Sequence, residues 1–248
     1  MRSRIAEALA LKHAPVAVVL TDAKPEQALQ FKEGSRGCVG AMLYAAAKGR
    51  TVVFDRKTFG CPGGGTGLGF GNCYAAFAID RLLSTGGKAE LPNGQVFDMG
   101  EGERFFESPE AAARWAAALP YHDVPTEFIV CKPLDQVAEG EDVSLVLMFV
   151  NPDQISALVT LAGFRRGGFD ATVAPWGAAC QSILFAHAEA GSENPRGVIG
   201  FFDISQRRKI EKELLSFTMP YRKYLEMESS VDESFLSTPM WQKLRKRW

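Results

Sequence analysis

The chain has 248 residues, a hydrophobic fraction of 46% and a formal net charge of −1 at pH 7. These values are typical of a globular protein with a sizeable core, and they give no sign of the basic stripe that most nucleic-acid-binding proteins present. No apolar run reaches the roughly 18 residues that a membrane span needs. We therefore expect a cytoplasmic protein that binds neither nucleic acid nor membrane.

The first part of the chain predicts alternating strands and helices. Residues 16–20 are apolar and rich in valine, which favours a strand. Pro25 is followed by an acid and a glutamine, which is typical of a helix start. A further helix is expected over 43–48, because a glycine stop follows it, and residues 51–54 predict another strand.

A glycine-rich run surrounds one cysteine. Six of the ten residues at 60–69 are glycines, and Cys61 lies between a glycine and Pro62. Glycine lets the backbone come close to a bound group, and backbone N–H donors tune metal–sulfur centres. The pattern predicts a loop that presents Cys61 as a thiolate ligand; the alternative is a tight turn with a buried structural cysteine.

The middle of the chain predicts peripheral elements and one core strand. The turn-rich stretch 86–103 favours an exposed loop or hairpin. Ser108, followed by proline, is typical of a helix cap, and the helix is expected to continue to Leu119. Residues 128–131 predict a short strand that places Cys131 in the core.

The second half repeats the order of elements found in the first. Apolar residues from Val143 match those from Val16, and Pro152, again followed by an acid and a glutamine, matches Pro25. A helix, a strand and a small-residue loop with Cys180 follow. We interpret this as an internal duplication; chance similarity of two α/β stretches is the alternative.

The expected fold is one α/β (or α+β) domain over residues 1–248. Two similar strand-helix-strand halves, at about 15–85 and 142–205, would form a single mixed sheet. Residues 206–248 are expected to form a C-terminal helical segment, with a closing helix from Asp232 onward.

The five cysteines do not suggest disulfides. An odd number without CxxC spacing argues against a disulfide framework and against a zinc ribbon. The fold would have to gather them, and the duplication would let Cys61 and Cys180 face each other, with Cys38 added from the first half. Three thiolates could hold three irons of a [4Fe–4S] cluster, or zinc with one open position. Cys73 is a weaker candidate for a fourth ligand.

Six further residues are expected around this centre. They supply backbone or side-chain polar groups: Gly60, Gly63, Gly64, Gly65, Gln181 and Ser182. Other chemistry finds little support, because the chain has neither a Walker motif nor a recognisable Ser-His-Asp order. Of the three histidines, His187 alone is kept open as a ligand or base.

The cysteine motifs resemble a known family. Cys38 followed by Val-Gly-Ala-Met, Cys61-Pro-Gly-Gly with Leu68-Gly-Phe, Lys132-Pro-Leu, Ala179-Cys-Gln-Ser and Thr218-Met-Pro-Tyr together resemble domain-of-unknown-function family 169 over nearly the whole chain. The resemblance implies no assigned activity. Many members of that family also carry a Gly-Cys-Ile-Gly-Cys run.

The present chain departs from the family pattern at that run. It has Gly197-Val-Ile-Gly-Phe there, without cysteine. The cysteines shared with the family pattern are therefore Cys38, Cys61 and Cys180.

The sequence thus predicts a metal-binding or iron–sulfur protein with a redox or sulfur-related role. One alternative is a module that binds a small non-metal ligand at residues 60–71; a second is a structural or assembly protein. The expected partner is a small molecule or a redox partner. Whether the protein is an enzyme or a homo-oligomer is left open.

Overall fold

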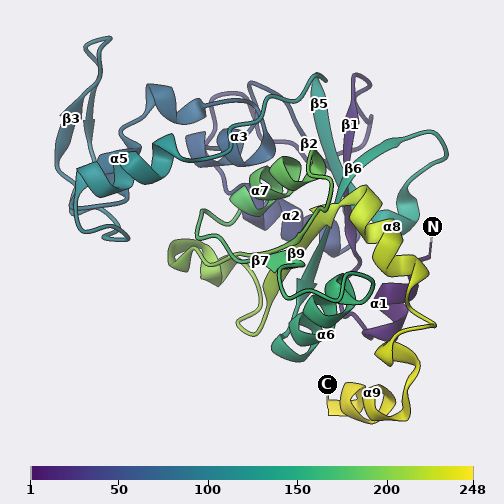
Figure 1. The fold of residues 1–248 in the computed structure, drawn as a ribbon. Coiled ribbons are helices and arrows are strands. Elements are labelled where there is room, and N and C mark those ends of the chain that lie inside the picture. Colours follow the sequence, from purple (N-terminus) through teal and green to yellow (C-terminus); the bar gives the residue numbers. More distant parts are fainter. Residues whose placement is uncertain (1, 248) are drawn as a thin grey trace.

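A seven-stranded mixed sheet forms the centre of the computed structural model, which describes residues 2–247 (Figure 1). Neighbouring strands are antiparallel, except for one parallel pair at the edge. In sheet order, the strands are β2 (Val52–Phe54), β5 (Phe128–Pro133), β1 (Val16–Thr21), β6 (Asp142–Val150), β9 (Leu215–Pro220), β8 (Gly197–Gly200) and β7 (Thr172–Val173). The predicted α/β class with a mixed sheet is confirmed.

Helices cover both faces of this sheet. The helices of residues 2–247 are α1 (Arg4–Ala8), α2 (Val39–Ala47), α3 (Pro62–Leu68), α4 (Ile79–Leu82), α5 (Pro109–Ala117), α6 (Pro152–Gly163), α7 (Gln181–Ala190), α8 (Tyr221–Ser229) and α9 (Pro239–Leu244). The same residues also form short 3₁₀ turns: η1 (Cys73–Ala76), η2 (Leu134–Gln136), η3 (Ile204–Lys209), η4 (Phe235–Ser237) and η5 (Arg245–Arg247). None of the helices in residues 2–247 is long and apolar enough to cross a membrane.

Alternating side chains of β1 build two cores. Val16 and Val18 pack into the core under α2, α3 and α7, whereas Ala17 and Val19 pack into the core under α1, α6 and α8. Because successive side chains of a strand point to opposite faces, a strand covered on both faces is apolar at every position. This accounts for the unbroken apolar run at the start of β1.

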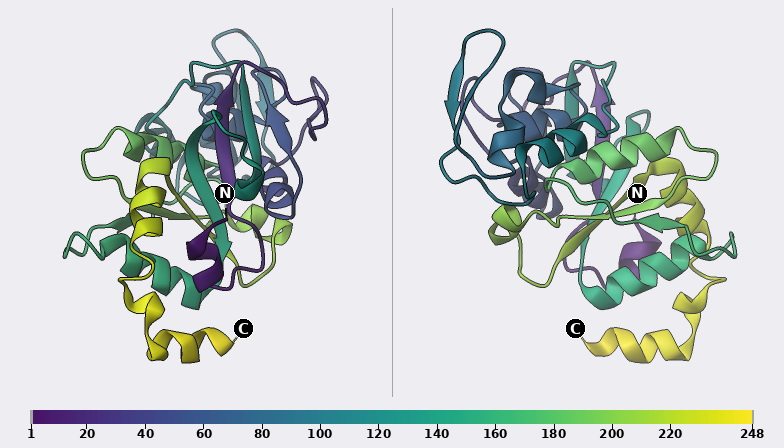
Figure 2. Two further views of the ribbon diagram at one scale, coloured as in Figure 1. Left: turned by 90° about the vertical axis from the view of Figure 1, so that its right-hand side faces the viewer. Right: turned by 60° about the vertical axis from the view of Figure 1, so that its left-hand side comes forward.

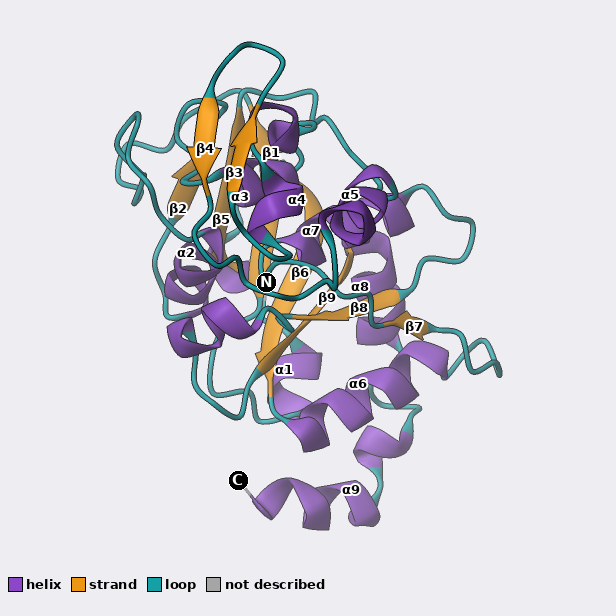
Figure 3. Cartoon of the chain, turned by 90° about the vertical axis from the view of Figure 1, so that its left-hand side faces the viewer, coloured by secondary structure: helices purple, strands orange, loops and turns teal. Residues whose placement is uncertain are grey.

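Residues 70–127 form an insertion beside the sheet. It contains η1, α4, the hairpin of β3 (Lys88–Glu90) and β4 (Val96–Asp98), and α5. The insertion lies away from α9. Within the insertion, the hairpin is the part that projects furthest from the central sheet (Figures 1, 2 and 3). The expected hairpin is confirmed, and so is the Ser108 cap, whose Oγ accepts a hydrogen bond from the N–H of Ala111 at 3.2 Å.

The internal duplication is not confirmed. Pro152 begins α6, where Asn151 and Gln154 form a reciprocal capping box. The expected helix at Pro25 is absent, since the chain there is irregular up to α2. Pro25 is preceded by a lysine, which offers no side-chain acceptor for the first helical N–H groups. The order strand, helix, strand and cysteine does recur in both halves.

The expectation of a wholly helical C-terminal segment at 206–248 is wrong. Strand β9 lies within this segment and pairs with both β6 and β8. Phe217 and Met219 of β9 enter the core beneath α6 and α8. Apolar and polar residues alternate along β9, and this period of two residues is the period of a strand. The expected closing helix is also divided into η4 and α9, and residue 248 lies outside the described residues.

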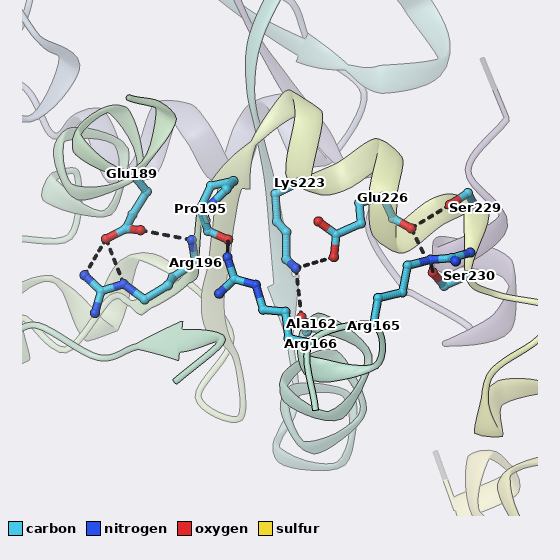
Figure 4. A network of polar contacts seen from close by, with 10 residues as sticks. All are labelled: Ala162, Arg165, Arg166, Glu189, Pro195, Arg196, Lys223, Glu226, Ser229 and Ser230. Carbon is cyan, nitrogen blue, oxygen red and sulfur yellow. Dashed lines mark hydrogen bonds and ion pairs between the residues drawn. The ribbon is translucent and has the colours of Figure 1, made fainter. Parts of the chain in front are cut away.

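A fully buried lysine ties α8 to the end of α6 (Figure 4). The Nζ of Lys223 donates to the carbonyl oxygen of Ala162 at 2.8 Å and forms an ion pair with Glu226 at 2.7 Å. Burial lowers the pKa of Lys223, while Glu226 opposes that shift. The ammonium group therefore satisfies one of the open carbonyls at the end of α6.

Replacing Lys223 by methionine is expected to lower the free energy of unfolding by about 2 kcal/mol, because it leaves the Ala162 carbonyl without this donor. Urea denaturation measures the loss. Lys24→Met, at an exposed lysine, is the control and should change stability by less than about 0.5 kcal/mol. Equal midpoints for the two variants would contradict this role of Lys223.

Candidate functional site

One cavity of about 460 Å³ contains all three predicted ligand cysteines in its lining. Cys38, Cys61 and Cys180 come from three separate segments of the chain. Another part of the lining belongs to the insertion, with Tyr74 and Trp115 among its residues. The cavity thus lies between the insertion and the helical layer over the sheet.

Direct hydrogen bonds join the three cysteine segments. The N–H of Gly37 donates to the carbonyl oxygen of Gly60 at 3.1 Å, so the residues that precede Cys38 and Cys61 are bonded to each other. The thiol of Cys180 donates to the carbonyl oxygen of Gly63 at 3.1 Å. The cysteine-bearing segments are therefore neighbours, although they are far apart in the sequence.

Each of the three cysteines is the residue at which a helix starts. Cys38 is the N-cap of α2, Cys61 the N-cap of α3 and Cys180 the N-cap of α7. The Sγ of Cys61 accepts a hydrogen bond from the N–H of Gly64 at 3.3 Å, whereas the other two cysteines make no side-chain cap bond. Backbone N–H donors at a helix start favour the thiolate form of a cysteine, and among these three cysteines Cys61 has such a donor.

The glycine-rich run forms a helix rather than the expected loop. Residues Pro62–Leu68 are α3, and its glycines allow close packing. A Cβ at Gly65 would lie 2.6 Å from the Sγ of Cys73, and one at Gly67 would lie 2.8 Å from the Sγ of Cys180. The left-handed conformation is confined to the ends of the run, at Gly60 and Gly69. The glycines therefore bring the α3 backbone against the start of α7.

Replacing Gly67 by alanine is expected to cost about 2 kcal/mol of stability. Its new Cβ would meet the backbone carbonyl of Cys180 at 2.9 Å, and backbone cannot move aside as a flexible side chain can. Thermal or urea denaturation measures the effect. Gly191→Ala is the matched control, because a Cβ there meets nothing within 4 Å. Equal stability of the two variants would show that α3 can shift freely.

Burial opposes ionisation of two of the thiols. Cys180 is 6% exposed, and desolvation raises its pKa well above the usual value, helped by the nearby charges of Cys61, Cys38 and Asp203. Desolvation also raises the pKa of Cys61, although the N–H donors of Gly64 and Gly63 partly lower it. Both thiols are therefore protonated at neutral pH unless a metal or another electrophile displaces the proton.

The side chains do not form a ready-made coordination sphere. Within residues 2–247, no group of three or more His, Cys, Asp or Glu side chains is arranged to hold a metal ion. Cys180 instead donates to Gly63, and Cys61 caps α3. The thiols thus share a cavity, while their sulfur atoms keep separate hydrogen-bond partners.

The remaining two cysteines lie outside the cavity lining. Cys131, on β5, is completely buried, and burial raises its pKa to about 12. This is the core position that the sequence predicts. The thiol of Cys73 donates to the carbonyl oxygen of Phe70 at 3.5 Å. Cys73 is therefore bonded within its own segment and is not among the residues that line the cavity.

Most of the other predicted site residues lie outside the cavity lining. Only Gly63 among them lines the cavity; the others are Gly60, Gly64, Gly65, Gln181 and Ser182. Gln181 is fully buried, donates to the hydroxyl of Tyr74 at 2.8 Å and accepts from the N–H of Ala178 at 2.8 Å. Ser182 donates to the carbonyl oxygen of Ala179 at 3.3 Å. Gln181 therefore fixes a cavity-lining tyrosine rather than a sulfur.

The sequence interpretation missed an aromatic wall. Its cavity-lining members are Tyr74, Phe77, Phe105, Trp115 and Trp176. The rings of Trp115 and Trp176 are 5.2 Å apart, and the Nε1 of Trp115 donates to the carbonyl oxygen of Trp176 at 3.3 Å. The concentration of aromatic residues between 105 and 115 was the available signal.

Charged residues at the cavity were missed as well. They are Arg36, Glu103, Asp203, Arg208 and Lys209. Asp203 is only 7% exposed, and its Oδ1 accepts hydrogen bonds from the N–H and hydroxyl of Ser205 at 3.0 and 2.7 Å. Burial and the charge of Asp203 raise the pKa of Glu103. The cavity therefore has polar groups of both signs beside its apolar wall.

His187 lies outside the cavity lining and is stacked on another histidine. Its ring centroid is 4.6 Å from that of His122, and its Nδ1 is 3.5 Å from the Oγ of Ser144. Its Nε2 is buried without a hydrogen-bond partner, and burial, with the charge of His122, lowers the pKa of His187 to about 3. The structure therefore places this histidine in the core rather than beside the cysteines.

Comparison with known proteins identifies the family alone. Neither a curated protein nor a solved structure matches the chain. The model of the family DUF169, described as "Uncharacterised ArCR", matches residues 4–230. The match includes all three cysteines of the cavity and confirms the resemblance drawn from their motifs. The chain therefore belongs to DUF169, an uncharacterised domain-of-unknown-function family.

Proposed function

We propose that the cavity holds a thiolate-bound metal centre. The favoured centre is an iron–sulfur cluster, and zinc is the alternative. Its protein ligands would be Cys38, Cys61 and Cys180. The observation that carries the proposal is the meeting of these three cysteines, each at the start of a helix, on one cavity. Sulfur ligands select iron–sulfur clusters or zinc over magnesium and calcium.

The surroundings of the thiols fit this donor set. Backbone N–H groups at helix starts stabilise thiolates, and the N–H of Gly64 already donates to the sulfur of Cys61. Binding would release thiol protons and would replace the hydrogen bond from Cys180 to Gly63. A side-chain rotation at Cys180 is therefore part of the proposal.

A bound cluster would supply electron transfer or a Lewis-acidic iron with an open position. The three cysteines would hold three irons of such a cluster and leave the fourth without a cysteine ligand, free for a small molecule. The protein's own residues would exclude bulk water with the aromatic wall and position a small molecule beside the open site. We assign the protein on this basis to redox or sulfur-related chemistry in the cytoplasm.

Anaerobic purification tests this proposal. Protein prepared without oxygen should show a broad absorbance near 400 nm, together with iron and acid-labile sulfide bound in about equal amounts. Bound zinc without colour would support the second form of the centre. Protein that is free of iron and zinc, and that takes up neither during anaerobic reconstitution, would contradict the proposal.

A second candidate function is supported by the cavity itself. Its volume of about 460 Å³ lies within the range of small-molecule sites, and its walls are largely aromatic and aliphatic. In this alternative the cysteines would be part of the lining of a ligand-binding module. Uptake of a small molecule by protein that binds no metal would favour it.

A further inference from the structure

We infer that the cavity binds a flat, conjugated organic anion, whose ring system lies against the Trp115–Trp176 wall and whose acidic group faces Arg36, Arg208 and Lys209. The inference rests on the proposed use of this cavity as a binding site, and it does not depend on which metal is bound. It names the ligand class for the space beside the thiols.

The aromatic wall is held in place by contacts among its own rings. Trp176 packs edge-on against Phe105 at 5.3 Å, Phe106 at 5.2 Å and Trp115 at 5.2 Å between ring centroids. The hydrogen bond from Trp115 Nε1 to the Trp176 carbonyl fixes the two tryptophans relative to each other. Both tryptophans are only partly buried and line the cavity. A preorganised wall of this kind favours flat apolar ligands.

The wall joins two parts of the fold. Phe105 and Trp115 belong to the insertion, whereas Trp176 lies in the loop before α7, four residues from Cys180. A ligand between the tryptophans and the thiols would therefore contact the insertion and the helical layer together. This position is shared with the open face of the proposed metal centre.

Three exposed cationic side chains contribute to the same cavity. Arg36 comes from the loop before α2, and Arg208 and Lys209 come from η3. The neighbouring Arg207 anchors η3 instead, because its guanidinium donates to the backbone carbonyls of Leu214 and Lys212. The three other cations have room to meet an incoming anion, and guanidinium groups are well suited to carboxylates and phosphates.

The two carboxylates at the cavity do not cancel this attraction. Asp203 already accepts two hydrogen bonds from Ser205. Glu103 faces Asp203 closely enough for the charge of Asp203 to raise its pKa. The three cations outnumber the two acids, and their side chains are exposed, whereas Asp203 is buried. We therefore assign the ligand a negative rather than a positive group.

Three matched naphthalene probes test the inference. Naphthalene-2-carboxylate, naphthalene-2-carboxamide and 2-naphthylmethylammonium share one ring system and differ in charge. Isothermal titration of reduced, metal-free full-length protein should give the tightest binding for the carboxylate, by about tenfold over the amide. The ammonium probe should bind most weakly.

Variants assign the binding to the named residues. Arg208→Gln should weaken binding of the carboxylate probe by about fivefold and leave binding of the amide unchanged. Trp176→Leu should weaken binding of all three probes. Arg50→Gln, at an exposed arginine outside the cavity lining, is the control and should change none. Because Trp176→Leu could disturb folding, an independent readout is the quenching of intrinsic fluorescence by the carboxylate in a Trp241→Phe/Trp248→Phe background, which keeps Trp115 and Trp176 alone.

Several results would overturn the inference. They are equal binding of carboxylate and amide, tightest binding of the ammonium probe, absence of binding by all three, and insensitivity to Arg208→Gln. These results leave the metal proposal intact, because the titration uses metal-free protein. Conversely, a protein that never binds metal but prefers the carboxylate would retain the ligand inference alone.

Discussion

Cys180→Ser is expected to lower metal binding by more than about 100-fold relative to the unaltered protein. Cys180 has the most enclosed of the three thiols and faces Cys61 and Cys38 closely enough for their charges to act on its pKa. A serine hydroxyl keeps the size of the side chain but is a poor ligand for iron in a cluster. Cys38→Ser and Cys61→Ser should have the same effect, since two sulfurs do not retain a cluster.

Metal content after anaerobic reconstitution measures this effect. Cys131→Ala and Cys73→Ala are the matched controls, because each removes a thiol outside the cavity lining. Both should keep full metal content, although Cys131→Ala loses some core packing. Equal metal loss in a control and in Cys180→Ser would mean that the cysteines act through stability rather than as ligands.

Acid is expected to destabilise the protein through His187 by about 4 to 5 kcal/mol in total. Burial and the charge of His122 lower the pKa of His187 from 6.5 to about 3. Between these values the unfolded chain binds a proton that the folded chain does not bind. Stability therefore falls as the pH drops from about 6.5 to about 3, by up to about 1.36 kcal/mol for each pH unit.

Urea denaturation at a series of pH values measures this slope. His187→Gln removes the titrating group, so its unfolding free energy should depend less steeply on pH across this window, whatever its stability at pH 7. The ring proton resonances of His187 in the unaltered protein should also show no protonation above about pH 4. An unchanged slope in His187→Gln, or titration of His187 near pH 6.5, would contradict the buried neutral ring.

The strands and the helix caps were largely predictable, because they depend on local patterns. A few adjacent residues are enough to predict the strand β1 from its valines and the start of α5 from its Ser108 cap. Pro25 misled because proline favours a helix start only when a capping side chain precedes it, as Asn151 precedes Pro152. Strand β9 was missed although Phe217 and Met219 alternate with polar residues.

The cysteines of the site could be predicted from the sequence, but the packing of distant segments around them could not. The repeated order of elements and the family motifs together pointed to Cys38, Cys61 and Cys180, and the fold brings them to one cavity. The sequence could not reveal that Gly67 serves close packing against Cys180, because that contact joins distant segments. For the same reason the approach of Trp115 to Trp176, across the insertion, has no local signature.

Diffraction from anaerobically grown crystals at the iron and zinc absorption edges tests the central claim most directly. The proposal predicts an anomalous peak in the cavity, with the sulfurs of Cys38, Cys61 and Cys180 each about 2.3 Å from a metal atom. A cluster would give several iron positions, and zinc a single one. Full-length protein that, after reconstitution, shows no metal peak at the three cysteines, or holds its metal at other residues, would contradict the account.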